Sequence, residues 1–194
     1  TGANARHAGY TIARGHADVE AIWSMRKRAV GLLGNVEGPV RPVAFVEDTA
    51  VPPENLAPYI REFRALLDGA GLSYGMFGHV DAGVLHVRPA LDLTRDDHIK
   101  LVREVSDAVV ALTRKYGGVL WGEHGKGVRS EYVPEFFGDL YPSLQEIKRA
   151  FDPETRLNPG KIAAPAGQAL LKIDDVPLRG ETDRIIGNEI RSAF

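Results

Sequence analysis

The spacing of apolar residues changes along the chain and predicts a mixture of helices and strands. Apolar residues that recur every three or four positions share one face of a helix, whereas short apolar runs between turn-forming residues favour strands. From residue 43 to residue 121 these patterns predict the order strand, helix, strand, strand, helix, strand. The predicted ranges are 43–47, 52–69, 72–77, 84–87, 94–116 and 119–121.

Both predicted helices have an apolar stripe. The first begins at Pro52-Pro53, and the second begins at Thr94, which we expect to cap it with Asp97 in the first turn. The stripes are Leu56, Tyr59, Ile60, Phe63 and Leu67 in the first helix, and Ile99, Val102, Val105, Val109 and Leu112 in the second. A turn at 81–83 joins the middle strands into a hairpin. This order predicts an α+β, ferredoxin-like domain of the split βαβ type, an antiparallel sheet with helices on one face.

Further elements are predicted on either side of this domain. Residues 7–13 favour a strand, and a helix up to Gly34 follows, with its stripe at Val19, Ile22, Trp23, Arg26, Val30 and Leu33. A short helix over 144–151 ends before Asp152-Pro153, because the residue before a proline is disfavoured in a helix. We expect three parts: a strand–helix segment at 1–40 packing on the domain, the ferredoxin-like domain at 41–164, and an extended connector at 165–194. We also expect both ends to be cuts in a longer protein.

Composition narrows the class of protein. Of the 194 residues, 44% are hydrophobic and 26% are charged, which is typical of a globular domain. The net charge of −2 and the scattered basic residues argue against a nucleic-acid partner. Without cysteine, the chain itself can form neither a disulfide nor an iron–sulfur site. No apolar run approaches the roughly 20 residues of a transmembrane segment. We expect a cytoplasmic location, with peripheral membrane attachment as the alternative.

Two polar clusters carry the candidate chemistry. The run GHVDAGVLH at 78–86 sets His79 and His86 on either side of a turn, which can bring both imidazoles to one point. The run WGEHGKG at 121–127 brackets a carboxylate and an imidazole with three glycines, which permit close approach to a ligand. His79, His86 and Glu123 form a candidate open metal site. From spacing alone, the alternative is that they are ordinary hairpin and loop residues.

These runs, with a third near the end of the domain, resemble the signatures of a known family. GHVDAGVLH is similar to GHxGDGNxH, GEHGKG (122–127) to GEHGxG, and FDPETRLNPGKI (151–162) to FDPxxxLNPGK, in the C-terminal domain of FAD-linked oxidases of the vanillyl-alcohol oxidase type. WSMR (23–26) resembles that family's WxxR helix. The family includes D-lactate dehydrogenases, glycolate oxidase large subunits and D-2-hydroxyglutarate dehydrogenases.

The resemblance implies both a fold and a metal site. The family's C-terminal domain is a ferredoxin-like cap over the flavin of an upstream domain, which agrees with the strand order predicted here. By similarity, His79, His86 and Glu123 bind a divalent cation, usually zinc, beside the flavin. The chain departs from the motif at 81–84, where Asp-Ala-Gly-Val replaces Gly-Asp-Gly-Asn, so no role is carried over to those side chains.

The resemblance also implies roles outside the metal site. By similarity, His124 is the catalytic base, Arg26 grips a substrate carboxylate, and Asn158 lies near the FAD. From the residues alone, Arg26 can equally extend from a core-facing helix to solvent, and Asn158 can equally belong to a plain turn.

The position of Arg88 in the sequence indicates which class of substrate to expect. It follows His86 by two residues, so on a strand both side chains share a face, and a second carboxylate clamp suits a diacid. We therefore expect the substrate-binding part of an FAD-dependent oxidoreductase that oxidises a D-2-hydroxy acid, D-2-hydroxyglutarate in preference to D-lactate. No dinucleotide fingerprint occurs, so we expect an upstream flavin-binding domain to be the partner that holds the FAD. An iron–sulfur electron acceptor, as a further region or as a separate protein, is left open.

Two other interpretations stay open at the level of sequence. A flavin oxidase cap that acts on another alcohol would need no carboxylate clamp. A ferredoxin-like module that binds a metal or small molecule for regulation would carry out no redox chemistry, and an upstream flavin domain would exclude it.

Overall fold

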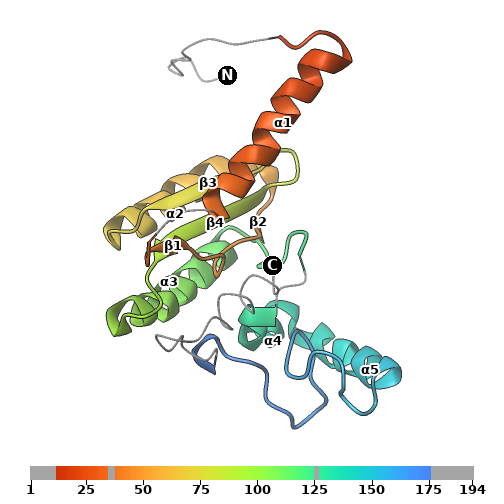
Figure 1. The fold of residues 1–194 in the computed structure, drawn as a ribbon. Helices are drawn as coiled ribbons and strands as arrows, with labels where there is room; N and C mark the ends of the chain where they lie inside the picture. The colour runs from red at the N-terminus through yellow and green to blue at the C-terminus, as the bar shows by residue number, and fades with distance from the viewer. Residues whose placement is uncertain (1–11, 35–37, 125–126, 176–194) are drawn as a thin grey trace. The chain divides into compact units, whose positions relative to one another are not determined.

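The computed structural model describes residues 12–34, 38–124 and 127–175, and the chain divides into two units, residues 1–36 and 37–194. The described part of the first unit contains one helix, α1 (Gly15–Gly34), which confirms the helix predicted there (Figure 1). The strand predicted at 7–13 falls mostly outside the described residues, and Ile12 and Ala13 form no strand.

An antiparallel sheet forms the centre of the second unit. Strand β4 (Val84–Leu91) pairs with β3 (Tyr74–His79) along one edge and with β1 (Arg41–Pro42) and β2 (Thr49–Ala50) along the other. An isolated bridge adds Val119 beside Ala50. The sheet therefore runs in the order residue 119, β2, β4, β3, which is the order of a ferredoxin-like split βαβ fold. The predicted α+β class is confirmed.

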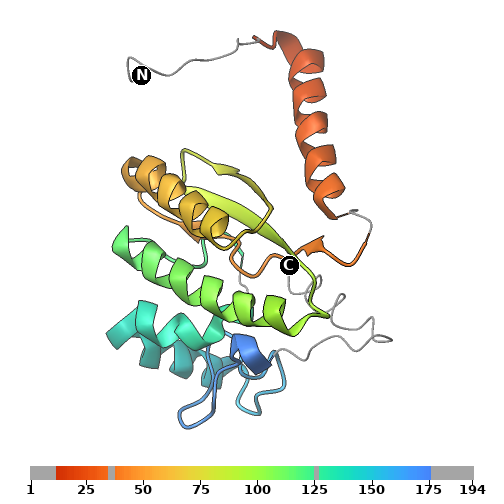
Figure 2. The same ribbon diagram turned by 90° about the vertical axis from the view of Figure 1, so that its left-hand side faces the viewer.

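Two long helices cover one face of this sheet. Helices α2 (Leu56–Gly69) and α3 (Asp96–Lys115) lie side by side in Figure 2. Burial of each large apolar side chain between helix and sheet stabilises the fold by about 1.5–3 kcal/mol. The core comprises chiefly Phe45, Val46, Leu56, Tyr59, Phe63, Leu67, Leu85, Val87, Leu91, Val105 and Val109. Both predicted stripes thus supply core residues.

The C-terminal helices lie on the other side of α3 from α2 (Figure 2). They are α4 (Val133–Phe137) and α5 (Tyr141–Phe151), and α5 confirms the helix predicted over 144–151. Short 3-10 turns occur at Pro53–Asn55, Gly127–Tyr132, Gly138–Leu140 and Ile173–Asp175. In the described part of the chain, no helix is both long and apolar enough to cross a membrane.

The strand predicted at 43–47 is wrong, and a bulge takes its place. Thr49 lies seven positions after Pro42, but its partner Leu85 lies only five positions before Ala90, the partner of Pro42. Between these two pairs, the chain from Pro42 to Thr49 therefore holds two residues more than the stretch of β4 that faces it. Regular pairing breaks between β1 and β2 as a result. The bulge buries the consecutive acids Glu47 and Asp48, which a regular strand would direct to opposite faces.

Two smaller predictions are also corrected. The strand at 119–121 is reduced to the single bridge at Val119, because Gly122 turns the chain back to Asp48 through a 2.9 Å hydrogen bond. Thr94 does not cap α3; its hydroxyl donates to the Asp92 carboxylate at 2.6 Å, and the helix begins at Asp96.

Candidate metal and substrate site

The β3–β4 hairpin places two histidines on one face of the sheet. His79 pairs with Val84, and Val84 lies two residues before His86 on β4. Directly opposed residues share a face, and so do residues two apart on a strand, so both imidazoles point to the same side. Their ring centroids lie 5.4 Å apart.

Glu123 joins the two histidines from the loop that follows Val119. Its Oε1 lies 3.1 Å from His79 Nε2 and 3.7 Å from His86 Nε2. The three ligand atoms all lie within 4.8 Å of one another. Two imidazole nitrogens and a carboxylate are a donor set that zinc and related divalent cations accept in catalytic sites, with further positions open to substrate oxygens. The chemistry and spacing of these side chains therefore fit a divalent cation.

Asp48 fixes the loop that carries Glu123. The side chain is fully buried, and its carboxylate accepts the backbone N–H of Glu123 at 3.0 and 3.2 Å and that of His124 at 2.8 Å. Its own carbonyl accepts the N–H of Gly122. Asp48 adopts a φ of 71°, a left-handed conformation that is uncommon outside glycine. One strained residue of the bulge thus holds three consecutive residues of the loop.

Glu47 lies on the other side of the same histidines. Its carboxylate forms a forked ion pair with Arg88, at 2.9 Å from Nε and 3.2 Å from Nη2. Glu47 Oε1 also lies 3.4 Å from His86 Nδ1 and 3.9 Å from His124 Nδ1. The residue is 1% exposed. Arg88 therefore does stand beside the site, as the sequence suggested, but an acid of the same chain already binds one edge of its guanidinium.

His124 completes the cluster. Its ring stacks on that of His86, with centroids 5.3 Å apart and planes 18° apart. The side chain is 42% exposed, whereas that of His86 is 5% exposed. An imidazole that is both held and accessible can exchange a proton with a bound ligand.

Arg129 is a buried cation that interacts electrostatically with the two acids Glu47 and Asp48. It is 1% exposed, and its Nη2 donates to the backbone carbonyl of Leu120 at 2.6 Å and to that of Glu47. Burial lowers the pKa of Arg129 to about 10, so the guanidinium stays charged at neutral pH. Arg88 and Arg129 together balance the buried charges of Glu47 and Asp48.

The sequence patterns did not single out Glu47, Asp48 or Arg129. Glu47 was predicted as the polar end of the strand at 43–47, and no role was assigned to Asp48 or Arg129. The one available signal was a pair of adjacent acids directly after an apolar run, Val43 to Val46. Charged residues are rarely placed so close to a core without a partner, so such a pair favours a buried polar network.

Comparison with known proteins identifies the family. The family model described as "FAD linked oxidases, C-terminal domain" matches residues 2–162 of this chain. The chain belongs to this family. The resemblance found in the motifs at 78–86, 122–127 and 151–162 is thereby confirmed.

This FAD-linked oxidase domain is similar in sequence to several dehydrogenases. The chain is 64% identical over 188 residues to a D-2-hydroxyglutarate dehydrogenase of Pseudomonas putida and 60% identical over 189 residues to one of Escherichia coli, each match covering 96% of the chain. It is 34% identical over 127 residues, 65% of the chain, to a D-lactate dehydrogenase of Archaeoglobus fulgidus, of which the match covers 28%. The chain spans only 19% and 18% of the length of the first two relatives.

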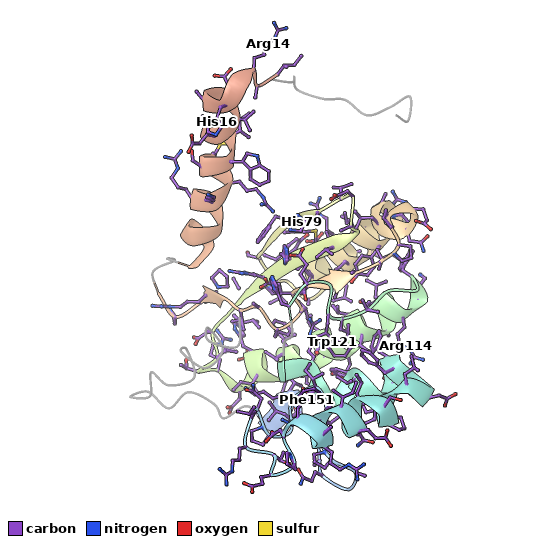
Figure 3. All side chains as sticks on the ribbon, turned by 90° about the vertical axis from the view of Figure 1, so that its right-hand side faces the viewer. Arg14, His16, His79, Arg114, Trp121 and Phe151 are labelled. Atoms are coloured by element: carbon purple, nitrogen blue, oxygen red, sulfur yellow. The ribbon has the colours of Figure 1, made fainter. Side chains whose placement is uncertain are left out.

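Of the two remaining predicted site residues of this FAD-linked oxidase domain, Asn158 lies apart from the cluster within the second unit. Arg26 belongs to the first unit, where its guanidinium lies 5.1 Å from the centre of the Trp23 ring. Asn158, at a φ of 45°, lines a cavity of about 670 Å³ whose wall includes Phe151 and Lys161 but none of the clustered histidines. Figure 3 shows Phe151 well separated from His79. The second unit thus brings together His79, His86, Arg88, Glu123 and His124, and places Asn158 elsewhere.

Proposed function

We propose that this chain is the substrate-binding domain of an FAD-dependent dehydrogenase that oxidises D-2-hydroxyglutarate to its 2-oxo acid in preference to D-lactate. The observation that carries the proposal is the position of Arg88 beside the cluster of His79, His86 and Glu123. A hydroxy diacid has a second carboxylate for Arg88 to bind, whereas lactate has none. The high identity to proteins named D-2-hydroxyglutarate dehydrogenase supports the same choice.

The cofactors follow from the family and from the donor set. We propose FAD, held mainly by an upstream domain, and a divalent cation, zinc, held by His79, His86 and Glu123. When bound, the flavin would supply the acceptor for the α-hydrogen of the substrate together with two electrons, and the cation would supply the positive charge that polarises the substrate hydroxyl. Any iron–sulfur cluster that receives the electrons must draw cysteine ligands from outside these 194 residues, which contain none.

Three side chains of this chain would handle the substrate itself. His124 is half-exposed beside the metal ligands and would take the hydroxyl proton on an imidazole nitrogen. Arg88 would bind the distal carboxylate through the guanidinium edge that Glu47 leaves open. Arg26 would bind the carboxylate next to the reacting carbon, and a forked, charge-assisted pair there would fix its orientation.

The proposed metal site can be tested by elemental analysis of the full-length enzyme. We expect about one equivalent of zinc or a related cation in the wild type, and its loss in a His79→Ala, His86→Ala double variant, which removes two of three protein ligands. His16→Ala is the matched control, because this exposed histidine belongs to α1 of the first unit and is none of the three proposed ligands. Unchanged metal content in the double variant would show that the site is misassigned.

The proposed activity is tested with the full-length, flavin-loaded wild type. We expect kcat/KM for D-2-hydroxyglutarate to exceed that for D-lactate, with reduction of the flavin absorbance as the direct readout. Preference for lactate would remove the diacid assignment and leave a flavoenzyme for monoacids. No reduction by either acid, but reduction by another alcohol, would favour the alternative substrate class.

A further inference from the structure

Glu47 contacts three side chains of the site although it comes from the bulge before β2. Its carboxylate binds Arg88 along two hydrogen bonds and also faces the Nδ1 atoms of His86 and His124. A carboxylate that is 1% exposed is stable only where such groups compensate its lost hydration. The position of the Glu47 carboxylate and the positions of the three side chains that it faces therefore depend on one another.

The two nitrogens of His86 face different acids. Nε2 points toward Glu123 Oε1 at 3.7 Å, on the side of the metal ligands, and Nδ1 points toward Glu47 Oε1 at 3.4 Å. Nδ1 is buried and makes no hydrogen bond within the described part of the chain, and the carboxylate of Glu47 is the acid that faces it. An imidazole whose Nδ1–H is directed at a carboxylate carries its lone pair on Nε2, the form that binds a metal. Glu47 is thus placed to select the ligating tautomer of His86.

Arg88 is oriented by the same carboxylate. A guanidinium offers two edges for forked binding, and Glu47 occupies the edge formed by Nε and Nη2. Nη1 forms no hydrogen bond among residues 12–34, 38–124 and 127–175, and the side chain is 23% exposed. The second edge, formed by Nη1 and Nη2, is therefore held in a defined direction for an anionic ligand.

We propose that Glu47 is a positioning residue that sets the His86 tautomer for metal binding and holds Arg88 for a second carboxylate. The inference rests on the proposed function, because it assigns Glu47 a role toward the proposed cation. Groups that orient a ligating histidine typically contribute 10–100-fold to metal affinity. Glu47 itself is not a ligand in this arrangement, since its Oε1 faces the Nδ1 side of His86.

The test uses two variants of the full-length, flavin-loaded enzyme that break the same ion pair from opposite ends. Metal-free enzyme is titrated with Zn²⁺ in competition with a chromogenic chelator. Glu47→Gln removes the carboxylate that faces His86, and we expect its zinc affinity to fall about 10–100-fold. Arg88→Gln leaves that carboxylate in place, and we expect zinc affinity within about twofold of wild type, because it removes only the other partner of Glu47. Melting temperature and flavin content are recorded for both variants.

Four results would overturn the inference. Equal losses of zinc affinity in both variants would mean that the ion pair matters only for packing. An unchanged affinity in Glu47→Gln, or a wild type that binds no zinc, would remove the role toward His86. The ligand atoms of Glu47, His86 and His124 also lie within 4.8 Å of one another. Complete loss of zinc in Glu47→Gln with retention in a third variant, Glu123→Gln, would therefore make Glu47 a ligand together with those two histidines. Oxidation of D-2-hydroxyglutarate is measured separately, so failure of the proposed function is distinguishable from each of these.

Discussion

The carboxylate of Asp48 accepts the backbone N–H of His124 at 2.8 Å, across 76 positions of the sequence. The same carboxylate accepts the N–H of Glu123, so the proposed base and one proposed metal ligand share a single anchor. Backbone groups held in this way cannot move independently, which keeps both side chains in place relative to the hairpin histidines. Asp48 is fully buried, so water cannot replace it.

We predict that Asp48→Asn destabilises the domain by at least about 2 kcal/mol, because hydrogen bonds to a charged acceptor contribute about 1.5–3 kcal/mol. The asparagine also turns an N–H₂ group toward backbone donors. The measurement is urea unfolding of this chain, with zinc affinity of the full-length enzyme as a second readout. Asp68→Asn is the control, since the carboxylate of Asp68 accepts only the hydroxyl of Tyr74 among the described residues, in a hydrogen bond near the surface. Equal stability of the two variants would contradict the anchoring role.

Loss of Arg88 should discriminate between substrates. We predict that Arg88→Gln lowers kcat/KM for D-2-hydroxyglutarate about tenfold to hundredfold, corresponding to the 1.5–3 kcal/mol of a charge-assisted pair. The value for D-lactate should change much less, because lactate has no second carboxylate. Arg95→Gln removes an exposed pair with Asp97 and serves as the control. Equal losses on the two acids would remove the diacid assignment while leaving the flavoenzyme intact.

Periodicity predicted the regular parts of the fold because those parts obey it. Tyr59 and Phe63 recur at helical spacing, and both are fully buried against the sheet in α2. The hairpin was predictable for a similar local reason: Gly83 follows Asp81-Ala82 between two apolar runs, and it adopts a φ of 68°. The motif residues His79 and His86 could be placed together because only the turn between them had to be known.

The burial of Glu47 and Asp48 and their pairing with distant residues of the site could not be predicted from local patterns. Glu47 and Asp48 are buried by a bulge whose length depends on how β1 and β2 pair with β4. Their partners Arg88 and Glu123 lie 41 and 75 positions away along the chain. Periodicity carries no information about such distant pairing, so Glu47 was assigned to the end of a regular strand and Asp48 to no element.

Gly83 provides a test of the hairpin turn. We predict that Gly83→Ala destabilises the chain by more than about 1–2 kcal/mol, the usual cost of a left-handed conformation in a residue with a Cβ. That Cβ would also overlap the carbonyl oxygen of Val51. Gly69→Ala is the control, because a Cβ at the end of α2 meets nothing within 4 Å. Thermal unfolding of both variants should give a clear loss for the first and little change for the second; similar melting temperatures would contradict this account of the turn.

The lowered pKa of the Asp152 carboxylate predicts how the free energy of unfolding depends on pH. Its carboxylate accepts a hydrogen bond from Lys148 Nζ at 2.6 Å and from the backbone N–H groups of Leu157 and Arg156, each at 2.9 Å. These bonds, that of Lys148 first, lower the pKa of Asp152 from 3.8 to about 2. A group whose pKa is lower in the folded state binds protons more readily when unfolded, so it stabilises the fold above pH 3.8. That contribution is lost as the pH falls through this value toward about 2.

We therefore predict that Asp152→Asn lowers the free energy of unfolding at neutral pH, and that the difference from wild type shrinks as the pH falls below about 4. The loss should begin at the turn that presents Asn158, because Asp152 holds the two residues before it. The measurement is urea unfolding of both chains at a series of pH values. Asp139→Asn, which removes an acid from the exposed turn before α5, is the control for a change in net charge. A difference between Asp152→Asn and wild type that stays constant from neutral pH down to pH 3 would show that the carboxylate's charge does not stabilise this turn.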